Sequence, residues 1–171
     1  MPALQSCMIR VMDATADLDA FDRRILAALQ RSGRMTYDEL AGVVGLSASA
    51  VLRRVRRLEA DGVITGYVAL VSATRLGLGL TAYISVRLDK RAPAAPRTPT
   101  DAFRAAVQVW PEVVECVALA GEMDYLLCVV VADMPHYARF ITETLLRHPA
   151  VQDVKTSFML DRVKHGRALP V

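Results

Sequence analysis

The chain has 171 residues, 53% of them hydrophobic and 23% charged, with a formal net charge of +3. This length and composition indicate a soluble globular protein of one or two small domains. No apolar run reaches the roughly 18 to 20 residues that cross a bilayer, and the opening residues lack the apolar core of a secretory signal, so we exclude a membrane span and expect a cytoplasmic protein.

The first predicted helix covers residues 19–30, where apolar side chains recur at the spacing of a helix with one buried face. Asp17 or Asp19 can accept hydrogen bonds from the free N–H groups at its start, and Gly33 is expected to end it. A capping box marks the start of a second helix, because the side chains of Thr36 and Glu39 can each accept from the other's backbone N–H.

The second helix is expected to end at Gly45, and a third begins at Ser47 and is closed by Gly62. Ala41, Gly45 and Val51 have the spacing of a helix-turn-helix. In that motif the small residue lets the two helices approach, the glycine forms the turn, and the aliphatic residue packs between the helices. The three helices are therefore predicted to form one compact unit.

The third helix carries four arginines within five residues. At about 100° per residue, its aliphatic residues fall on one side and its arginines on or beside the opposite side. The apolar side consists of Val51, Val55 and Leu58, and the basic side of Ser49, Arg53, Arg56 and Arg57, with Arg54 at its flank. Ordinary solvated faces mix acids and bases, whereas this face has no acid before Glu59. We therefore interpret it as a recognition helix rather than as a merely solvated surface.

The candidate DNA contacts follow from position along this helix. Residues near the N-terminus of a recognition helix reach base edges, and arginines further along suit phosphates. The predicted base or nearby phosphate contacts are Ser47, Ser49 and Arg53, and the predicted phosphate contacts are Arg54, Arg56 and Arg57. Arg34, in the turn before the second helix, is expected to add a contact to the DNA backbone.

Beyond the three helices the sequence predicts strands and helices in alternation. Residues 63–71 are rich in β-branched side chains and predict a strand that leaves the helical unit. Further strands are predicted at residues 81–88, 113–120, 125–132 and 151–160, and helices at residues 101–110 and 134–148. From residue 81 this order is that of a ferredoxin-like αβ sandwich (βαββαβ), so the fold class is α+β. Both helices are expected on one sheet face, leaving an apolar face that another subunit would bury.

Residues 89–100 interrupt this regularity with three prolines. Proline excludes a helix interior, but Pro99 suits the first helical position with Thr98 as the cap. A long loop is therefore expected before the first helix of the sandwich.

Two blocks of sequence resemble a known family, the Lrp/AsnC or feast/famine transcriptional regulators. Residues 18–67, which include LSASAVLRRVRRLEADGVITGY, resemble the family's DNA-binding domain. Residues 107–164, which include VVECVALAGEMDYLLCVVV, resemble its ligand-sensing domain. The resemblance implies an N-terminal winged-type helix-turn-helix joined by a linker strand to an αβ sandwich. It also implies homodimers that often assemble into octamers, with regulation by an amino acid or related small molecule.

This resemblance divides the chain into four parts. They are an N-terminal tail at residues 1–17, a DNA-binding domain at 18–64, a linker strand and turn at 65–80, and a ligand-sensing and oligomerisation domain at 81–171. The family's G-x-x-D loop corresponds here to GEMDY, so the implied effector-binding residues are Gly121, Glu122, Met123, Asp124 and Tyr125. A glycine brings backbone amides near a carboxylate, and an acid can pair with an ammonium group. A tight turn between two strands is the alternative interpretation of the same residues.

The residues that carry most enzyme chemistry are not grouped in the sequence. His136, His148 and His165 form no metal-spaced pair, and the three cysteines lack C-x-x-C spacing. The glycines of LGLGL, residues 76–80, lack the lysine of a phosphate loop and read as a turn. We therefore predict no catalytic residue, metal or cofactor. The alternative to a DNA-binding regulator is an amino-acid-sensing oligomer that acts through partner proteins.

Overall fold

The computed structural model describes residues 16–89, 98–164 and 168–171, and the chain divides into two compact units. The first unit runs to Leu70 and also takes in the C-terminal residues, and the second lies between residues 71 and 165. Residues 1–15 of the predicted tail, residues 90–97 of the proline-rich segment and His165 lie outside the described residues. In the described part of the chain, no helix combines the length and the apolar character that a membrane crossing requires.

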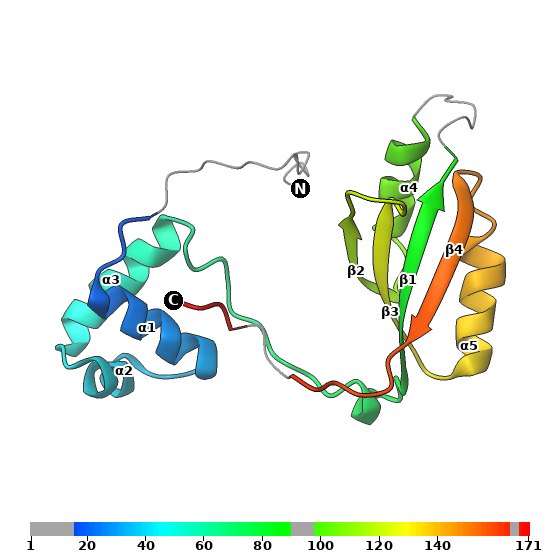
Figure 1. The fold of residues 1–171 in the computed structure, drawn as a ribbon. Helices are drawn as coiled ribbons and strands as arrows, with labels where there is room; N and C mark the ends of the chain where they lie inside the picture. Colours follow the sequence, from blue (N-terminus) through cyan, green and yellow to red (C-terminus); the bar gives the residue numbers. More distant parts are fainter. Residues whose placement is uncertain (1–15, 90–97, 165–167) are drawn as a thin grey trace. The chain divides into compact units, whose positions relative to one another are not determined.

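Three helices build the first unit (Figure 1): α1 at Ala20–Arg31, α2 at Tyr37–Val44 and α3 at Ala48–Ala60. The cap of α1 is Asp19 rather than Asp17, and Asp19 forms a capping box with Asp22. The predicted capping box of Thr36 and Glu39 is confirmed at the start of α2. The local capping chemistry thus fixes where these helices begin.

The ends of the helices agree with the sequence in two cases out of three. Gly45, after α2, takes the left-handed conformation with φ 78°, and Gly62, after α3, does so with φ 70°. The expectation that Gly33 ends α1 is wrong. Ser32 caps α1 in an extended conformation and donates its N–H to the carbonyl of Ala28, so no left-handed residue is needed there.

One side of each helix packs into a shared core. The fully buried residues of this core are Ile25, Leu40, Val44, Val51, Val55 and Leu58. The aliphatic side of α3 that the sequence predicts is therefore confirmed, and it fixes the helix against both α1 and α2.

Residues 63–71 do not form the predicted strand in this chain. Val68 is 85% exposed and Leu70 93% exposed, and none of the described strands pairs with the segment. β-branched residues favour an extended backbone, but a strand also requires a partner for its N–H and C=O groups. A short 3-10 turn follows at Thr74–Leu76, and Gly77 ends it with φ 76°, in agreement with the turn predicted for residues 76–80.

The C-terminal residues belong to the first unit because they bind α1. Leu169 donates its N–H to Gln30 Oε1 at 2.6 Å, and Gln30 Nε2 donates to the Leu169 carbonyl at 3.1 Å. The end of the chain therefore lies beside α1 (Figure 1).

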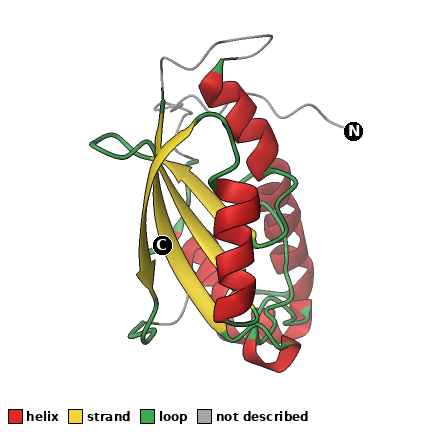
Figure 2. Cartoon of the chain, turned by 90° about the vertical axis from the view of Figure 1, so that its right-hand side faces the viewer, coloured by secondary structure: helices red, strands yellow, loops and turns green. Residues whose placement is uncertain are grey.

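The second unit is the predicted ferredoxin-like sandwich. Its elements are β1 at Leu80–Leu88, α4 at Pro99–Val107, β2 at Val113–Ala118, β3 at Tyr125–Val131, α5 at Met134–Arg139 with a π-helical continuation at Phe140–Leu145, and β4 at Val151–Phe158. The strand order is β2-β3-β1-β4, and every neighbouring pair is antiparallel. The helices of this unit, α4 and α5, lie on one face of the sheet (Figure 2). Pro99 occupies the first turn of α4 behind the Thr98 cap, as predicted.

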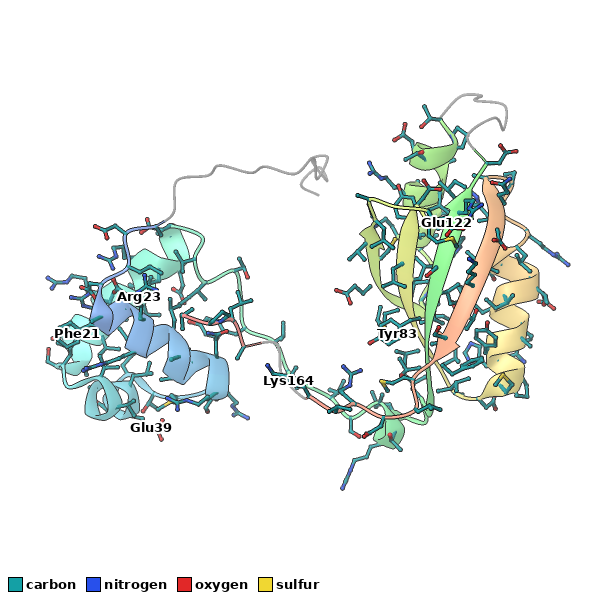
Figure 3. The ribbon with its side chains drawn as sticks, viewed as in Figure 1. Phe21, Arg23, Glu39, Tyr83, Glu122 and Lys164 are labelled. Carbon is teal, nitrogen blue, oxygen red and sulfur yellow. The ribbon has the colours of Figure 1, made fainter. Side chains whose placement is uncertain are left out.

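The two sheet faces differ in polarity. Ile84 and Val86 alternate along β1 with partly exposed residues and pack under the helices with Phe103 and Phe140. The outward residues of β1 include Tyr83, labelled in Figure 3, and also Ser85 and Arg87, with Lys155 of β4 opposite Ser85. The prediction of an apolar outer face is therefore wrong for β1. Its alternating pattern buries aliphatic side chains on one face and leaves mostly polar ones on the other.

His148 makes the stability of this unit depend on pH. Its ring packs edge-on against Phe103 and Trp110, with centroids 5.5 and 6.1 Å away, and burial lowers the pKa of the imidazole. Between the folded pKa and the ordinary value of about 6.5, the unfolded chain binds more protons than the folded one. With respect to this group, the free energy of unfolding is thus expected to be constant above about pH 6.5, to fall as the pH drops from there to the folded pKa, and to level off below it.

Urea denaturation followed by Trp110 fluorescence at neutral and mildly acidic pH measures this effect. His148→Asn is the matched variant, because an asparagine oxygen can replace Nδ1, which accepts the Ala150 N–H at 3.2 Å. The midpoint should fall less on acidification in the variant than in the wild type. Equal falls in the two proteins would contradict the assignment to His148.

Candidate nucleic-acid interface

The side of α3 opposite the core presents two free arginines. Arg53 and Arg56 are exposed, as is Ser49, which lies near the start of the helix. In the part of the chain that the structure describes, neither Arg53 nor Arg56 has an acidic partner within ion-pair distance. These two guanidinium groups are therefore available to an anionic ligand.

The other two arginines of α3 bind the start of α1. Arg54 Nη1 lies 2.6 Å from Asp19 Oδ2 and 2.9 Å from Asp22 Oδ1, and Arg57 Nη2 lies 2.5 Å from Asp22 Oδ2. The Asp22 carboxylate is almost fully buried, and a buried carboxylate is costly unless it is paired. Arg54 also lies over the ring of Phe21, 5.4 Å from its centroid; Figure 3 labels Phe21 on α1.

These ion pairs reinforce the capping of α1. The backbone N–H of Asp22 donates to the Asp19 carboxylate and lowers the pKa of Asp19. The hydrogen bond from Arg54 to the same carboxylate lowers this pKa further. In turn, hydrogen bonds to the two carboxylates raise the pKa of Arg54. Asp19 and Asp22 thus both cap the start of α1 and bind the arginines of α3.

The structure therefore places Arg54 and Arg57 differently from the expectation that both are directed at phosphates. The sequence held a signal for this arrangement. Asp22 precedes the buried Ile25 and Leu26 by three and four residues, so it falls on the apolar side of α1, where an acid requires a cationic partner.

The remaining predicted DNA contacts lie at the N-terminal ends of α2 and α3. Arg34 is exposed in the loop before α2. Ser47 accepts the N–H of Ala50 at 3.3 Å, so its hydroxyl is used to cap α3, and it also lies 3.1 Å from the Ser49 hydroxyl. Ser49 is consequently better placed than Ser47 to contact a ligand.

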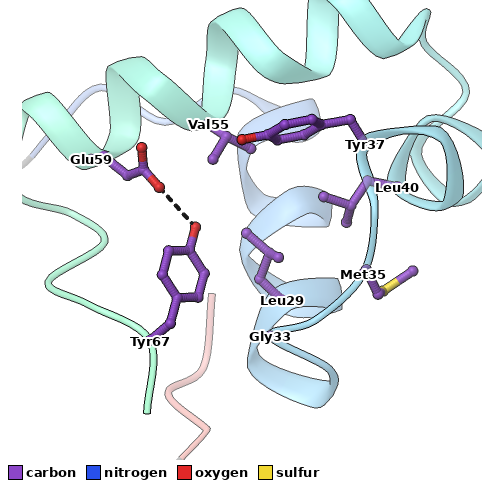
Figure 4. Close-up of a pocket in the computed structure, with 8 residues that line it drawn as sticks. All are labelled: Leu29, Gly33, Met35, Tyr37, Leu40, Val55, Glu59 and Tyr67. Carbon is purple, nitrogen blue, oxygen red and sulfur yellow. Dashed lines mark hydrogen bonds between the residues drawn. The ribbon is translucent and has the colours of Figure 1, made fainter.

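Glu59, the first acid after the arginines, is directed to the opposite flank of α3. Its Oε1 accepts a hydrogen bond from the Tyr67 hydroxyl at 3.0 Å (Figure 4). Burial, with the help of Glu59, raises the pKa of Tyr67 to about 12, so the phenol remains a donor at neutral pH. The pair borders a cavity of about 160 Å³ that is also lined by Leu29, Met35 and Leu40. Glu59 therefore does not neutralise the basic side of α3.

In the second unit, two residues of the predicted effector loop serve the sheet itself. Asp124 accepts the N–H of Leu88 on its side chain and donates its own N–H to the Val86 carbonyl, both at 2.9 Å. Tyr125 is buried against Phe103, and its hydroxyl accepts from Arg104 Nε at 2.9 Å. Both residues are thus bound to β1 or to the core.

The exposed part of the loop gathers charge. Glu122, labelled in Figure 3, is 72% exposed and forms ion pairs with Arg87 and with Lys155, the latter at 3.7 Å. Met123 Sδ lies 3.9 Å from Arg87 Nη2, and a side chain at Gly121 would contact nothing within 4 Å. Arg87 and Lys155 were not predicted, because they come from β1 and β4 and only the fold brings them to this loop.

Comparison with known proteins decides the family. A family model described as the Lrp/AsnC ligand-binding domain matches residues 81–169, and a winged helix-turn-helix DNA-binding model matches residues 18–65. The chain belongs to the Lrp/AsnC family. Leucine-responsive regulatory proteins from Salmonella typhimurium and Escherichia coli K12 are each 41% identical to it over 155 residues, which cover 91% of this chain and 92% of the relative.

Solved structures of transcriptional regulators have the same fold. A transcriptional regulator from Neisseria meningitidis, crystallised as an L-Met complex, is 43% identical with a TM-score of 0.84, over 90% of this chain and 96% of that one. An AsnC family regulator from Agrobacterium tumefaciens is 33% identical with a TM-score of 0.80, over 90% and 97%. The chain is therefore a DNA-binding transcriptional regulator of the Lrp/AsnC family, and its named relatives are regulators rather than enzymes.

Proposed function

We propose that α3 reads operator DNA through Ser49, Arg53 and Arg56, with Arg34 adding a phosphate contact. The observation that carries this proposal is the exposure of two unpaired guanidinium groups opposite the buried side of α3. Arginine donates two parallel hydrogen bonds to guanine in the major groove and binds phosphates equally well. We assign this role to a DNA-binding domain at residues 18–64, followed by a linker at 65–80 and a sensing domain at 81–171. A cytoplasmic location is part of this proposal, because the protein must reach chromosomal DNA.

Selection of bound fragments from genomic DNA, followed by affinity measurements at several salt concentrations, tests this function. Each phosphate contact contributes about −0.9 to the slope of log affinity against log salt concentration. A regulator that uses two or three basic residues per subunit should enrich particular sequences and bind them with a clearly negative slope. Binding without sequence enrichment, or with a slope near zero, would contradict the proposal.

We further propose that the effector is an amino acid and that it binds at the loop of residues 121–125. The L-Met complex of the Neisseria regulator supports this class of ligand. Glu122 is the exposed carboxylate able to pair with an α-ammonium group, while Arg87 and Lys155 supply positive charge for the α-carboxylate. Asp124 and Tyr125 then act by holding the loop on β1 and on the core.

Thermal denaturation with each amino acid in turn tests this assignment. A ligand present at a hundred times its Kd stabilises the folded protein by about 2.7 kcal/mol, which raises the melting temperature. Glu122→Gln should reduce the shift, whereas Glu143→Gln, at another exposed position, should not. An undiminished shift in Glu122→Gln would exclude this carboxylate from the site.

We also propose that the chain forms a homodimer, and that dimers assemble into octamers. The exposure of Val68, Leu70 and Leu160, between 85% and 98%, supports burial of these residues by another copy. Sedimentation velocity with and without the stabilising amino acid measures the assembly. A monomer at micromolar concentration would contradict the proposal.

A further inference from the structure

We propose that Asp19 and Asp22 act as internal substitutes for DNA phosphates, which keep Arg54 and Arg57 away from the duplex and so restrict α3 to contacts by Arg53 and Arg56. The inference rests on the proposed DNA-binding role of α3. It adds a determinant of selectivity on a different helix, α1.

The four arginines of α3 differ in their partners, although they lie within five residues of one another. At about 100° per residue, Arg53 lies opposite the aliphatic side of α3, Arg56 is displaced from it towards one flank, and Arg57 and Arg54 are displaced towards the other flank. The structure places Asp19 and Asp22 against that flank. Half of the positive charge of α3 is thus neutralised inside the protein.

Arg54 and Arg57 are kept from other anions by their ion pairs with Asp19 and Asp22 rather than by complete burial. Arg57 is 48% exposed and Asp19 is 49% exposed, so solvent reaches the edges of the cluster. A guanidinium group uses the same forked donors for carboxylates and for phosphates. Without the acids, both arginines would be able to bind the backbone of any duplex beside α3, and such contacts carry no sequence information.

Asp22 determines which partner the arginines retain. Its carboxylate is 1% exposed, and its two oxygens bind one arginine each. If both arginines moved to phosphates, Asp22 would be left as an unpaired buried charge, which is strongly unfavourable. The acids therefore compete successfully with DNA, and non-specific affinity is held down relative to specific affinity.

Asparagine substitutions test the proposal without removing the helix cap. Asp19→Asn and Asp22→Asn each remove one negative charge, and asparagine caps helices as well as aspartate does. We expect several-fold tighter binding to a duplex of scrambled sequence, with a slope of log affinity against log salt more negative by about 0.9 for each arginine released. Affinity for a selected operator should change less, so the ratio of specific to non-specific affinity falls.

Asp17→Asn is the matched control, since it makes the same charge change two residues away at an exposed position that has no arginine partner among the described residues. Adding Arg54→Ala to Asp19→Asn should restore the wild-type slope, which a purely structural role of Asp19 would not predict. The proposal is overturned if Asp19→Asn and Asp22→Asn match Asp17→Asn, or if both bind scrambled DNA more weakly than the wild type while melting normally.

The same measurements separate this inference from the proposed function. If Arg53→Ala and Arg56→Ala abolish operator binding while the aspartate variants behave as the control does, α3 is the recognition helix and only the role of the acids is wrong. If the arginine variants leave operator binding intact, the proposed function itself fails.

Discussion

Replacing Arg53 and Arg56 together with alanine is expected to weaken operator binding by about 2–6 kcal/mol, or roughly thirtyfold to twenty-thousandfold. Both side chains are exposed and lack acidic partners in the described part of the chain, so their removal should change the free energy of unfolding by less than about 0.5 kcal/mol. Fluorescence anisotropy with a labelled operator measures the affinity. Thermal denaturation measures the stability of the same samples.

A variant with the same change in net charge shows whether position on α3 matters. Arg23→Ala combined with Arg31→Ala removes two exposed arginines from α1 and leaves α3 intact. Its operator affinity should fall far less than that of the α3 double variant, since only long-range attraction is lost. Equal losses in the two proteins would mean that net charge, rather than the outward side of α3, governs binding.

Capping and hydrophobic spacing made the helices of the first unit predictable, because these signals lie within a few residues of each other. Thr36 and Glu39 start α2, and Gly45 ends it, as expected from their chemistry alone. Ser32 shows where this reasoning stops. An extended residue satisfied the end of α1 through a single backbone bond, so the nearby glycine was not needed.

The partners of the arginines were not predictable from the spacing of α3 alone. Arg54 and Arg57 meet Asp19 and Asp22 at separations of 32 to 35 residues, and only the packing of α1 on α3 brings them together. The loop of residues 121–125 shows the same limit. The sequence motif predicted the loop but not the direction of each carboxylate, which depends on strand register. In the structure Glu122 faces solvent, whereas Asp124 binds the backbone at the end of β1.

The absent strand at residues 63–71 has a similar cause. β-branched composition favours an extended backbone, whereas a strand also needs a neighbouring strand to pair with its N–H and C=O groups. The sheet of the second unit forms because β1 pairs on both sides, with β3 and with β4. Among the described residues, no strand pairs with residues 63–71, so their β-branched composition alone did not produce a strand.

The second large effect is expected in the core of the sensing domain. Phe103 on α4 is fully buried, and its ring lies 5.0 Å from that of Tyr125 and 5.8 Å from that of Trp110. Phe103→Ala should lower the free energy of unfolding of this unit by about 3–5 kcal/mol, through lost burial and an unfilled cavity. Trp110 is the only tryptophan, so its fluorescence reports this unit alone during urea denaturation.

Val109→Ala provides the control, because Val109 is 76% exposed and lies on the segment that follows α4. Its urea midpoint should stay close to that of the wild type, since exposed substitutions usually change stability by less than about 0.5 kcal/mol. A midpoint for Phe103→Ala close to that of Val109→Ala would contradict the packing. Because Tyr125 packs on Phe103 at the end of the proposed effector loop, the same variant should also lose the amino-acid-induced rise in melting temperature, which would link the core of the sandwich to the proposed ligand site.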